Sequence, residues 1–288
     1  CADRVAPSMI ASRVLAMMLV ANAASETGLH SSRPPSPHSS NLPVITIIAR
    51  EYAFDAPDTI RYGPTTIHLV SRGREQHFAQ LDRIEGGHSF ADFKRTLGTP
   101  GKTPWVTKVG GVGTLEPGGS ASTTLDLAPG LYAVICDMED ATGTPHMVEG
   151  MVRALSVSRT RNTAVMPVAD VRLTLTEYAF TLPAHLHAGP PAVAVRNAGT
   201  HAHMALLWRL HRGMTASDVA RWMNAPANNV PPTPVTLLGG TPDLDPGQAA
   251  QIVVRLDSGH YLLICLVDDV HDHKSHYAHG MLQEVMVE

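Results

Sequence analysis

Two short segments of the chain hold the same metal-binding residue types in the same order. They are "CDMEDATGTPHMVEGM", which begins at Cys136, and "CLVDDVHDHKSHYAHGM", which begins at Cys265. One further histidine lies well before each cysteine. Copper that cycles between Cu(I) and Cu(II) is bound by one thiolate, two imidazoles and a weak axial thioether. The candidate ligands are therefore His77, Cys136, His146 and Met151 for site 1, and His203, Cys265, His276 and Met281 for site 2.

The matching extends along most of the chain, which indicates an internal repeat. The motif "EYAF" occurs at 51–54 and again at 177–180, and the same offset of 126 residues separates His77 from His203. Each cysteine closes an apolar run, "LYAVIC" or "YLLIC", in a region whose Pro-Gly turns and alternating residues are typical of strand, turn, strand. A sulfur-rich loop that arose by accident is not expected twice with matched histidines.

The elements that must position these residues are strands. Short strands separated by Gly and Pro predict two antiparallel β-sandwiches in tandem, over residues 44–158 and 169–288, with a polar linker at 159–168. Each unit carries one short helical pattern, "SFADFKRTL" or "TASDVARWM", in which Ser or Thr precedes Asp by three residues as in a capping box. The aromatic residues of the repeated motif are predicted to lie in the core of the first strands: Tyr52, Phe54, Tyr178 and Phe180.

The totals describe a globular chain of 288 residues with 44% hydrophobic residues and a formal net charge of -4. A pI near 6.5 and the absence of a Lys/Arg-rich run argue against nucleic acid as a partner. The 16 His and 12 Met beside only 3 Cys favour soft and borderline metal ligands over a disulfide framework.

The N-terminal residues are typical of a targeting segment. Arg13, an apolar stretch over 14–20 and "ANA" at 21–23 predict a signal peptide over residues 1–23, followed by a Ser/Pro-rich disordered linker over 24–43. The apolar stretch is too short to span a bilayer, so no transmembrane segment is expected. We therefore expect export to the periplasm or the extracellular space. The alternatives are a frayed N-terminal helix and, at Cys1, a lipid-modified terminus.

On these residues each repeat resembles a cupredoxin, the blue (type 1) copper domain, in which a histidine in one loop is followed by Cys, His and Met around the last hairpin. The endings "HMVEGM" and "HYAHGM" are similar to that of plastocyanin. The resemblance implies an all-β chain of two tandem Greek-key β-sandwich domains, each with a short helical insertion and one type 1 copper. The chain departs from the family in its Cys-to-His loops, which hold nine and ten residues where small cupredoxins have two to four.

Other interpretations of these residues remain open. Each cysteine could be a small buried hydrophobe, and a disulfide between Cys136 and Cys265 is disfavoured because each belongs to its own unit. Four histidines of the second repeat form either a solvated polar surface or an accessory metal site, which Asp268, Asp269 and Asp272 would orient or join; they are His201, His271, His273 and His279.

Four functions compete. The resemblance extends to two-domain copper nitrite reductases and small laccases, which place a histidine beside the type 1 cysteine, but here the neighbours are Ile135 and Asp137 at one site and Ile264 and Leu266 at the other. We therefore expect an electron carrier rather than an enzyme, with a redox protein as its partner. The alternatives are copper storage, delivery or resistance, with a copper donor or acceptor as partner, and a metal-free binding module.

Overall fold

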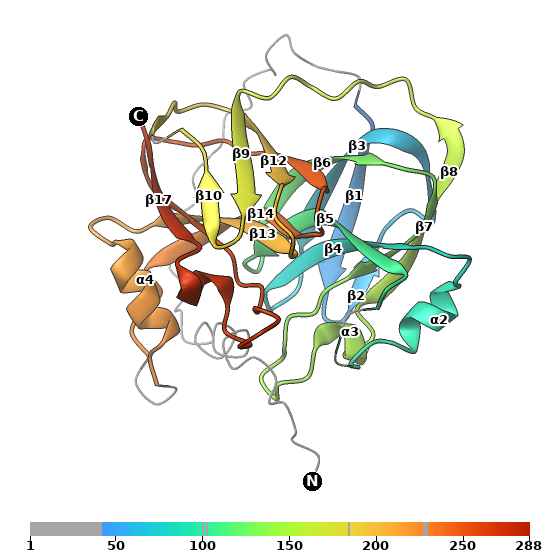
Figure 1. Cartoon of the computed structure of the whole chain (residues 1–288), viewed down its shortest axis with the longest axis horizontal. Coiled ribbons are helices and arrows are strands. Elements are labelled where there is room, and N and C mark those ends of the chain that lie inside the picture. Colours follow the sequence, from blue (N-terminus) through green and yellow to red (C-terminus); the bar gives the residue numbers. More distant parts are fainter. Residues whose placement is uncertain (1–41, 100, 102, 184, 227–229) are drawn as a thin grey trace.

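The computed structural model describes residues 42–99, 101, 103–183, 185–226 and 230–288. The predicted signal peptide lies outside these residues, as does most of the predicted linker that follows it. The described chain consists mainly of strands, which form two β-sandwiches side by side (Figure 1). The all-β class is confirmed.

The first half of the chain forms one sandwich. Its strands are β1 (Val44–Arg50), β2 (Ala53–Asp55), β3 (Thr59–Ser71), β4 (His77–Ile84), β5 (Val106–Leu115), β6 (Ser120–Leu127), β7 (Gly130–Ile135) and β8 (Val152–Arg161). One sheet has the order β2-β1-β3-β6 and the other the order β3-β8-β7-β4-β5. The long β3 takes part in both sheets, because its start pairs with β8 and its remainder pairs with β1 and β6.

The second half repeats this arrangement. Its strands are β9 (Val171–Thr176), β10 (Ala179–Thr181), β11 (His185–Leu186), β12 (Ala192–Asn197), β13 (His203–Leu210), β14 (Val235–Leu244), β15 (Ala249–Val253), β16 (Gly259–Ile264) and β17 (Leu282–Val287). The sheets have the orders β10-β9-β12-β15 and β11-β17-β16-β13-β14. Here two strands take the place of β3: β11 pairs with β17 in one sheet, and β12 pairs with β9 and β15 in the other.

The sheets are mixed, whereas the sequence predicted antiparallel sandwiches. β1 runs parallel to β3, and β9 runs parallel to β12. The reason is that β2 and β10 are additional short strands that fold back on β1 and β9. The chain therefore reverses twice before it enters the next long strand. The sequence does not indicate these three-residue strands, because a strand of three residues is too short to show a period-2 pattern.

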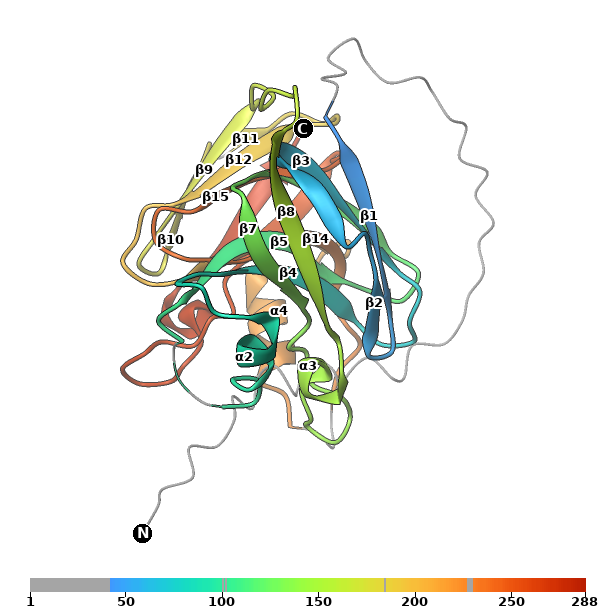
Figure 2. The same cartoon turned by 90° about the vertical axis from the view of Figure 1, so that its right-hand side faces the viewer.

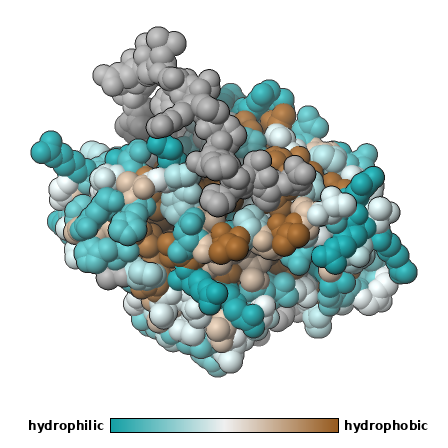
Figure 3. Space-filling view, turned by 90° about the horizontal axis from the view of Figure 1, so that it is seen from above, coloured by the Kyte–Doolittle hydropathy of each residue, from teal (hydrophilic) through white to brown (hydrophobic). Residues whose placement is uncertain are grey.

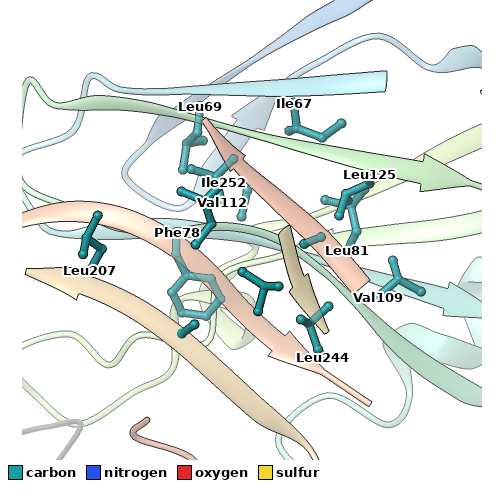
Figure 4. Close-up of a cluster of buried hydrophobic side chains, with 14 of the residues drawn as sticks. Ile67, Leu69, Phe78, Leu81, Val109, Val112, Leu125, Leu207, Leu244 and Ile252 are labelled. Atoms are coloured by element: carbon teal, nitrogen blue, oxygen red, sulfur yellow. The ribbon is translucent and has the colours of Figure 1, made fainter. Parts of the chain in front are cut away.

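The two sandwiches are joined through their strands and share a core. β6 pairs with β15, with Thr123 opposite Ile252, and β5 touches β14 where Val109 lies opposite Leu244. Figure 4 shows Phe78, Val112 and Leu125 of the first half lying among Leu207, Leu244 and Ile252 of the second. At the crossing of β5 and β14 a Cβ on Gly113 would lie 2.6 Å from the carbonyl oxygen of Gly239, so a side chain there would separate the halves.

Short helices cover one end and the flanks of the sandwiches (Figure 2). They are α2 (Phe90–Lys94), α3 (His146–Glu149), α4 (Ala216–Met223) and the 3₁₀ helix η1 (His276–His279). Both predicted capping boxes are present, Ser89 with Asp92 and Thr215 with Asp218. α4 packs its apolar face on an outer core around Trp208 and Trp222, while α2 covers a smaller core. The segment between the halves runs over 162–170 and is displaced from the predicted 159–168, because β8 continues to Arg161 and β9 begins at Val171.

The surface carries scattered rather than continuous apolar residues on the face that Figure 3 shows, where brown patches are separated by polar side chains. Among the described residues, no helix has the length and apolar character needed to cross a membrane.

Candidate metal centres

The structure brings together three of the four predicted ligands at each site. Among the described residues, the ligand atoms of His77, Cys136 and His146 lie within 4.8 Å of one another, and so do those of their counterparts in the second half, His203, Cys265 and His276. All six side chains are buried, none exposing more than 1% of its surface. These are the two groups of convergent metal-binding side chains in the part of the chain that the structure describes.

Adjacent strands position the ligands of site 1. His77 begins β4, and Cys136 directly follows β7, which pairs with β4. The Sγ atom of Cys136 accepts hydrogen bonds from the backbone N–H groups of Phe78 and Met138. His146 begins α3, and its Nδ1 lies 3.6 Å from Cys136 Sγ. The loop before α3 is held because the backbone N–H of His146 donates to the carbonyl of Met138 at 2.7 Å.

Site 2 has the same construction. His203 begins β13, and its Nδ1 lies 3.1 Å from Nδ1 of His276, at the start of η1. Nδ1 of His276 lies 3.5 Å from Cys265 Sγ, which accepts a hydrogen bond from the backbone N–H of Met204 at 3.4 Å. Two imidazole nitrogens and a sulfur thus converge from three elements on one point.

The fourth predicted ligand, the methionine, is tied to both neighbours through the main chain. Met151 is fully buried; its N–H donates to the carbonyl of His146, and its carbonyl accepts from the N–H of Cys136. In the second half Met281 is likewise buried and makes the corresponding bonds with His276 and Cys265. The methionine therefore directly precedes the last strand of each half, beside the cysteine.

Burial sets the protonation of the ligands. It raises the pKa of the Cys136 and Cys265 thiols to about 12. It lowers the pKa of His77 and His203 to about 4, with the neighbouring histidine of each site lowering it further. Burial also lowers the pKa of His146 and His276. At neutral pH the imidazoles are therefore uncharged, with a lone pair available, while each thiol holds one proton that a metal ion must displace.

The residues present fit a metal ion. Both ring nitrogens of His77 and Nε2 of His203 are buried without a hydrogen-bond partner. An unsatisfied buried polar atom costs roughly 1–3 kcal/mol, and a bound ion would supply the missing partner for one nitrogen of each ring. One sulfur and two imidazoles, with a thioether nearby, form a donor set for copper or zinc rather than for the hard, oxygen-seeking Mg²⁺ or Ca²⁺.

Sequence reasoning missed the residues that surround the ligands. Glu51 accepts hydrogen bonds from the backbone N–H groups of Arg74 and Glu75, and its Oε1 lies 3.8 Å from His77 Nε2. Glu75 lies over the other histidine, with Oε2 3.0 Å from His146 Nε2. In the second half Glu177 accepts from the N–H and hydroxyl of Thr200. These carboxylates hold the segment that leads into each β4 or β13 histidine.

The aromatic prediction is correct for half of its residues. Phe54 and Phe180 lie in the core, but Tyr52 and Tyr178 are only partly buried and adopt positive φ angles of 44° and 57°. Their rings lie against the loop histidines, with centroids 5.0 Å from His146 and 5.3 Å from His276 respectively. The available signal was the "EY" pair, since a charged residue beside a tyrosine, repeated twice, suits a turn better than a core strand.

A glycine precedes each first ligand by four residues and is required there. A Cβ on Gly73 would lie 2.4 Å from Nε2 of His77, and one on Gly199 would lie 2.9 Å from Nε2 of His203. Both distances are too short for real atoms. The repeated Gly in "RGREQH" and "AGTHAH" was the signal that could have found this close approach.

The additional histidines of the second half line its ligand loop. The rings of His201 and His271 lie 6.0 Å apart between centroids, and Nε2 of His279 lies 3.0 Å from Oδ1 of Asp272. His273 adopts a positive φ of 56°. Asp269 holds the loop, because its carboxylate accepts from the Tyr178 hydroxyl at 2.5 Å and from the N–H of His271 at 2.8 Å. Among the described residues, these histidines belong to no group of three convergent metal-binding side chains.

Cys136 and Cys265 are free thiols, each within its own site. Trp105 stacks on His88 with ring centroids 4.1 Å apart and packs against the α2 core.

Comparison with known proteins gives neighbours in structure only. No family model matches the chain, and no curated protein sequence matches it. Among solved structures, the chain is similar to the dithionite-reduced auracyanin of Roseiflexus castenholzii, with 23% identity, 40% of this chain and 96% of that chain covered, and a TM-score of 0.29. It is also similar to the copper nitrite reductase of Nitrosomonas europaea, with 14% identity, coverages of 85% and 93%, and a TM-score of 0.24. A multicopper oxidase matches with 14% identity, coverages of 85% and 88%, and a TM-score of 0.23.

Proposed function

We propose that each site binds one copper ion of the type 1 kind and that the protein transfers single electrons. The observation that carries this proposal is that a buried Cys, two buried histidines and a buried Met are assembled twice, by the same elements in each half. Copper bound by such a set supplies a one-electron couple between Cu(I) and Cu(II). The chain provides the ligands and the apolar surroundings that hold them.

The chain's contribution is a fixed and dry ligand set. The N–H groups of Phe78 and Met138 direct the Cys136 sulfur, and main-chain bonds hold Met151 between cysteine and histidine. Because the ligands come from β4, β7 and a short helix within one packed core, they cannot rearrange freely when the charge of the ion changes. Little rearrangement is what rapid electron transfer needs.

Full burial of the ligands favours electron transfer over copper delivery. A delivery site must release its ion to a partner, whereas here the histidines of both sites are at most 1% exposed, covered by Tyr52 and Tyr178 among others. Copper storage or delivery is the second candidate, and the observation in its favour is the His201–His271 pair beside site 2. Export, proposed from residues 1–23, would put either function in the periplasm or outside the cell.

We do not assign catalysis to either site. The residues beside the cysteines are Ile135 and Asp137 in the first half and Ile264 and Leu266 in the second, so no imidazole leads from the thiolate to a further metal. The partner that follows from this proposal is a redox protein, which donates or accepts one electron at a time.

The proposal is tested by adding Cu(II) to the purified protein and recording the visible spectrum and the copper content. We expect an intense thiolate-to-copper band that saturates at two copper ions per chain and disappears reversibly on one-electron reduction of each ion. The variants C136S and C265S should each lose one ion and its share of the band. Copper that binds without the band, or that a weak chelator removes at once, contradicts electron transfer and favours delivery.

A further inference from the structure

Where the two halves meet, the first half has polar side chains at positions that are apolar in the second half. They are Gln80 and Asp82 of β4, both about 3% exposed, and Lys108 of β5, which forms an ion pair with Asp243 of β14. Strand pairing places Leu206, Trp208 and Leu237 at the corresponding positions of the second half. Gln80 and Asp82 are buried polar residues where the other repeat has apolar ones, and this calls for an explanation beyond packing.

Gln80 crosses from one sandwich to the other. Its Nε2 donates one hydrogen bond to the carbonyl of Leu81 and a second, at 3.2 Å, to the carbonyl of Asp243. The partner strand is fixed in place, because Lys108 N–H donates to Asp245 Oδ2 and the N–H of Asp245 donates to the carbonyl of Lys108, both at 2.9 Å. These two bonds fix β14 against β5 next to the residue that Gln80 contacts.

Each end of this contact leads directly to a site. On one side, Gln80 lies opposite Ile135, the residue before Cys136, and Phe78, two residues from Gln80, donates its N–H to the Cys136 sulfur. On the other side, Asp243 precedes Leu244, which lies opposite His203. A continuous route of covalent bonds, strand pairing and one side-chain hydrogen bond thus runs from the thiolate ligand of site 1 to a histidine ligand of site 2.

The electrostatics agree with this position. The negative charge of Asp243 acts on His203, Cys265 and His276 of site 2. The same charge acts on Asp82 and on Asp137, the neighbour of Cys136. The charge of Asp243 therefore acts on three ligands of site 2 and, at site 1, on the residue next to the cysteine ligand.

We propose that Gln80, through its hydrogen bond to Asp243, is an internal bridge along which an electron passes between the two sites. This inference rests on the proposed function. One site is oxidised and the other reduced by one electron, while no bond forms or breaks and no proton moves. Hydrogen-bonded and packed networks carry energetic coupling between distant sites. Electrons tunnel more readily through covalent and hydrogen bonds than across van der Waals gaps. The second half has Leu206 where Gln80 stands, so the bond from Gln80 to the Asp243 carbonyl has no counterpart on that side of the interface.

The test injects electrons next to site 1 and counts how many the chain accepts. A ruthenium photoreductant is attached to a cysteine that replaces Val148, which is half exposed two residues from His146, in the full chain with Cys1 replaced by serine. The copper-loaded protein is illuminated with a sacrificial electron donor present. We expect the whole thiolate-to-copper band to bleach, because each electron that leaves site 1 for site 2 frees site 1 for the next.

The variant Gln80→Leu carries at this position the residue that the second half has. In this variant half of the band should bleach as fast as in the parent protein, and the other half should no longer bleach rapidly. Gln80→Met serves the same purpose if the leucine variant does not fold. The matched control is Thr123→Val, because Thr123 also donates a buried hydrogen bond across the interface, to the carbonyl of Gly240 at 3.1 Å, but not along this route. It should behave as the parent protein. C136S measures direct reduction of site 2 by the label, which we expect to be slow.

Three results would overturn the bridge: a parent protein that bleaches only by half, a Gln80 variant that bleaches fully at the parent rate, or a C136S variant in which site 2 is reduced as fast as in the parent. A protein that forms no thiolate-to-copper band overturns the proposed function as well, and so is distinguished from failure of the bridge alone.

Discussion

The number of protons released on metal binding follows from the burial of the ligands. Burial raises the pKa of both thiols to about 12, so at pH 7 only about one thiol in 10⁵ is ionised, and ionising it costs roughly 7 kcal/mol. The pKa of His77 and of His203 is lowered to about 4, so these imidazoles carry no proton to lose. Each metal ion should therefore displace one proton, from the cysteine alone.

We expect two protons per chain when zinc, which has no redox chemistry of its own, fills both sites at pH 7. The affinity should rise about tenfold per pH unit between about pH 5 and pH 9. Calorimetric titration in buffers of different ionisation enthalpy counts the protons directly. C136S should release one proton and bind one zinc ion with unchanged affinity at the other site.

Two results would refute this reasoning. Release of four or more protons per chain at pH 7 would mean that the histidines are charged in the metal-free protein, and that burial does not control them. Release of none would mean that the thiols are not ligands.

Three further predictions concern stability and the surroundings of the sites. The metal-free protein should lose stability as the pH falls from 6.5 towards 4, by up to roughly 3 kcal/mol for each of His77 and His203. The reason is that these histidines take up protons in the unfolded chain at a higher pH than in the folded chain. Urea unfolding at several pH values measures this loss, and a free energy of unfolding that does not change with pH would contradict it. Trp222→Ala should lower the free energy of unfolding by about 3–5 kcal/mol, since the ring is 1% exposed and packs edge-on against Trp208; a loss below 1 kcal/mol by chemical denaturation would show that α4 is not part of the core. Tyr178→Phe removes the hydroxyl that donates to Asp269 but keeps the ring against His276, so hydrogen exchange at the amide of His271 should speed up while copper stoichiometry stays at two per chain; unchanged exchange would mean that Asp269 does not hold the loop.

Much of the fold and the ligand sets was predictable because the repeat supplied each inference twice. Cys136 and Cys265 each directly follow a strong apolar strand, and the histidine and methionine after them recur in order, so their convergence follows from one strand pair and one loop. The capping boxes at Ser89 and Thr215 were predictable for a similar reason, since they depend only on residues three apart.

The rest depended on contacts between segments far apart in the chain. That Glu75 lies over His146, or that Tyr52 lies against it, follows from a turn with positive φ that no local pattern announces. The polar contact of Gln80 with Asp243 joins residues in different halves, and in the sequence Gln80 is only one polar residue in a strand. Such placements become visible only when the sheets are assembled.

The X-ray absorption spectrum of the copper-loaded protein tests most directly whether the two buried sites bind copper, because it reports the atoms bound to copper. We predict one short copper–sulfur bond and two copper–imidazole nitrogen bonds per ion, at two ions per chain. In C265S the sulfur signal per copper should halve if the displaced ion binds elsewhere. A spectrum with nitrogen and oxygen ligands but no short sulfur bond would contradict this prediction, because copper would then be held by surface histidines rather than by the two buried sites.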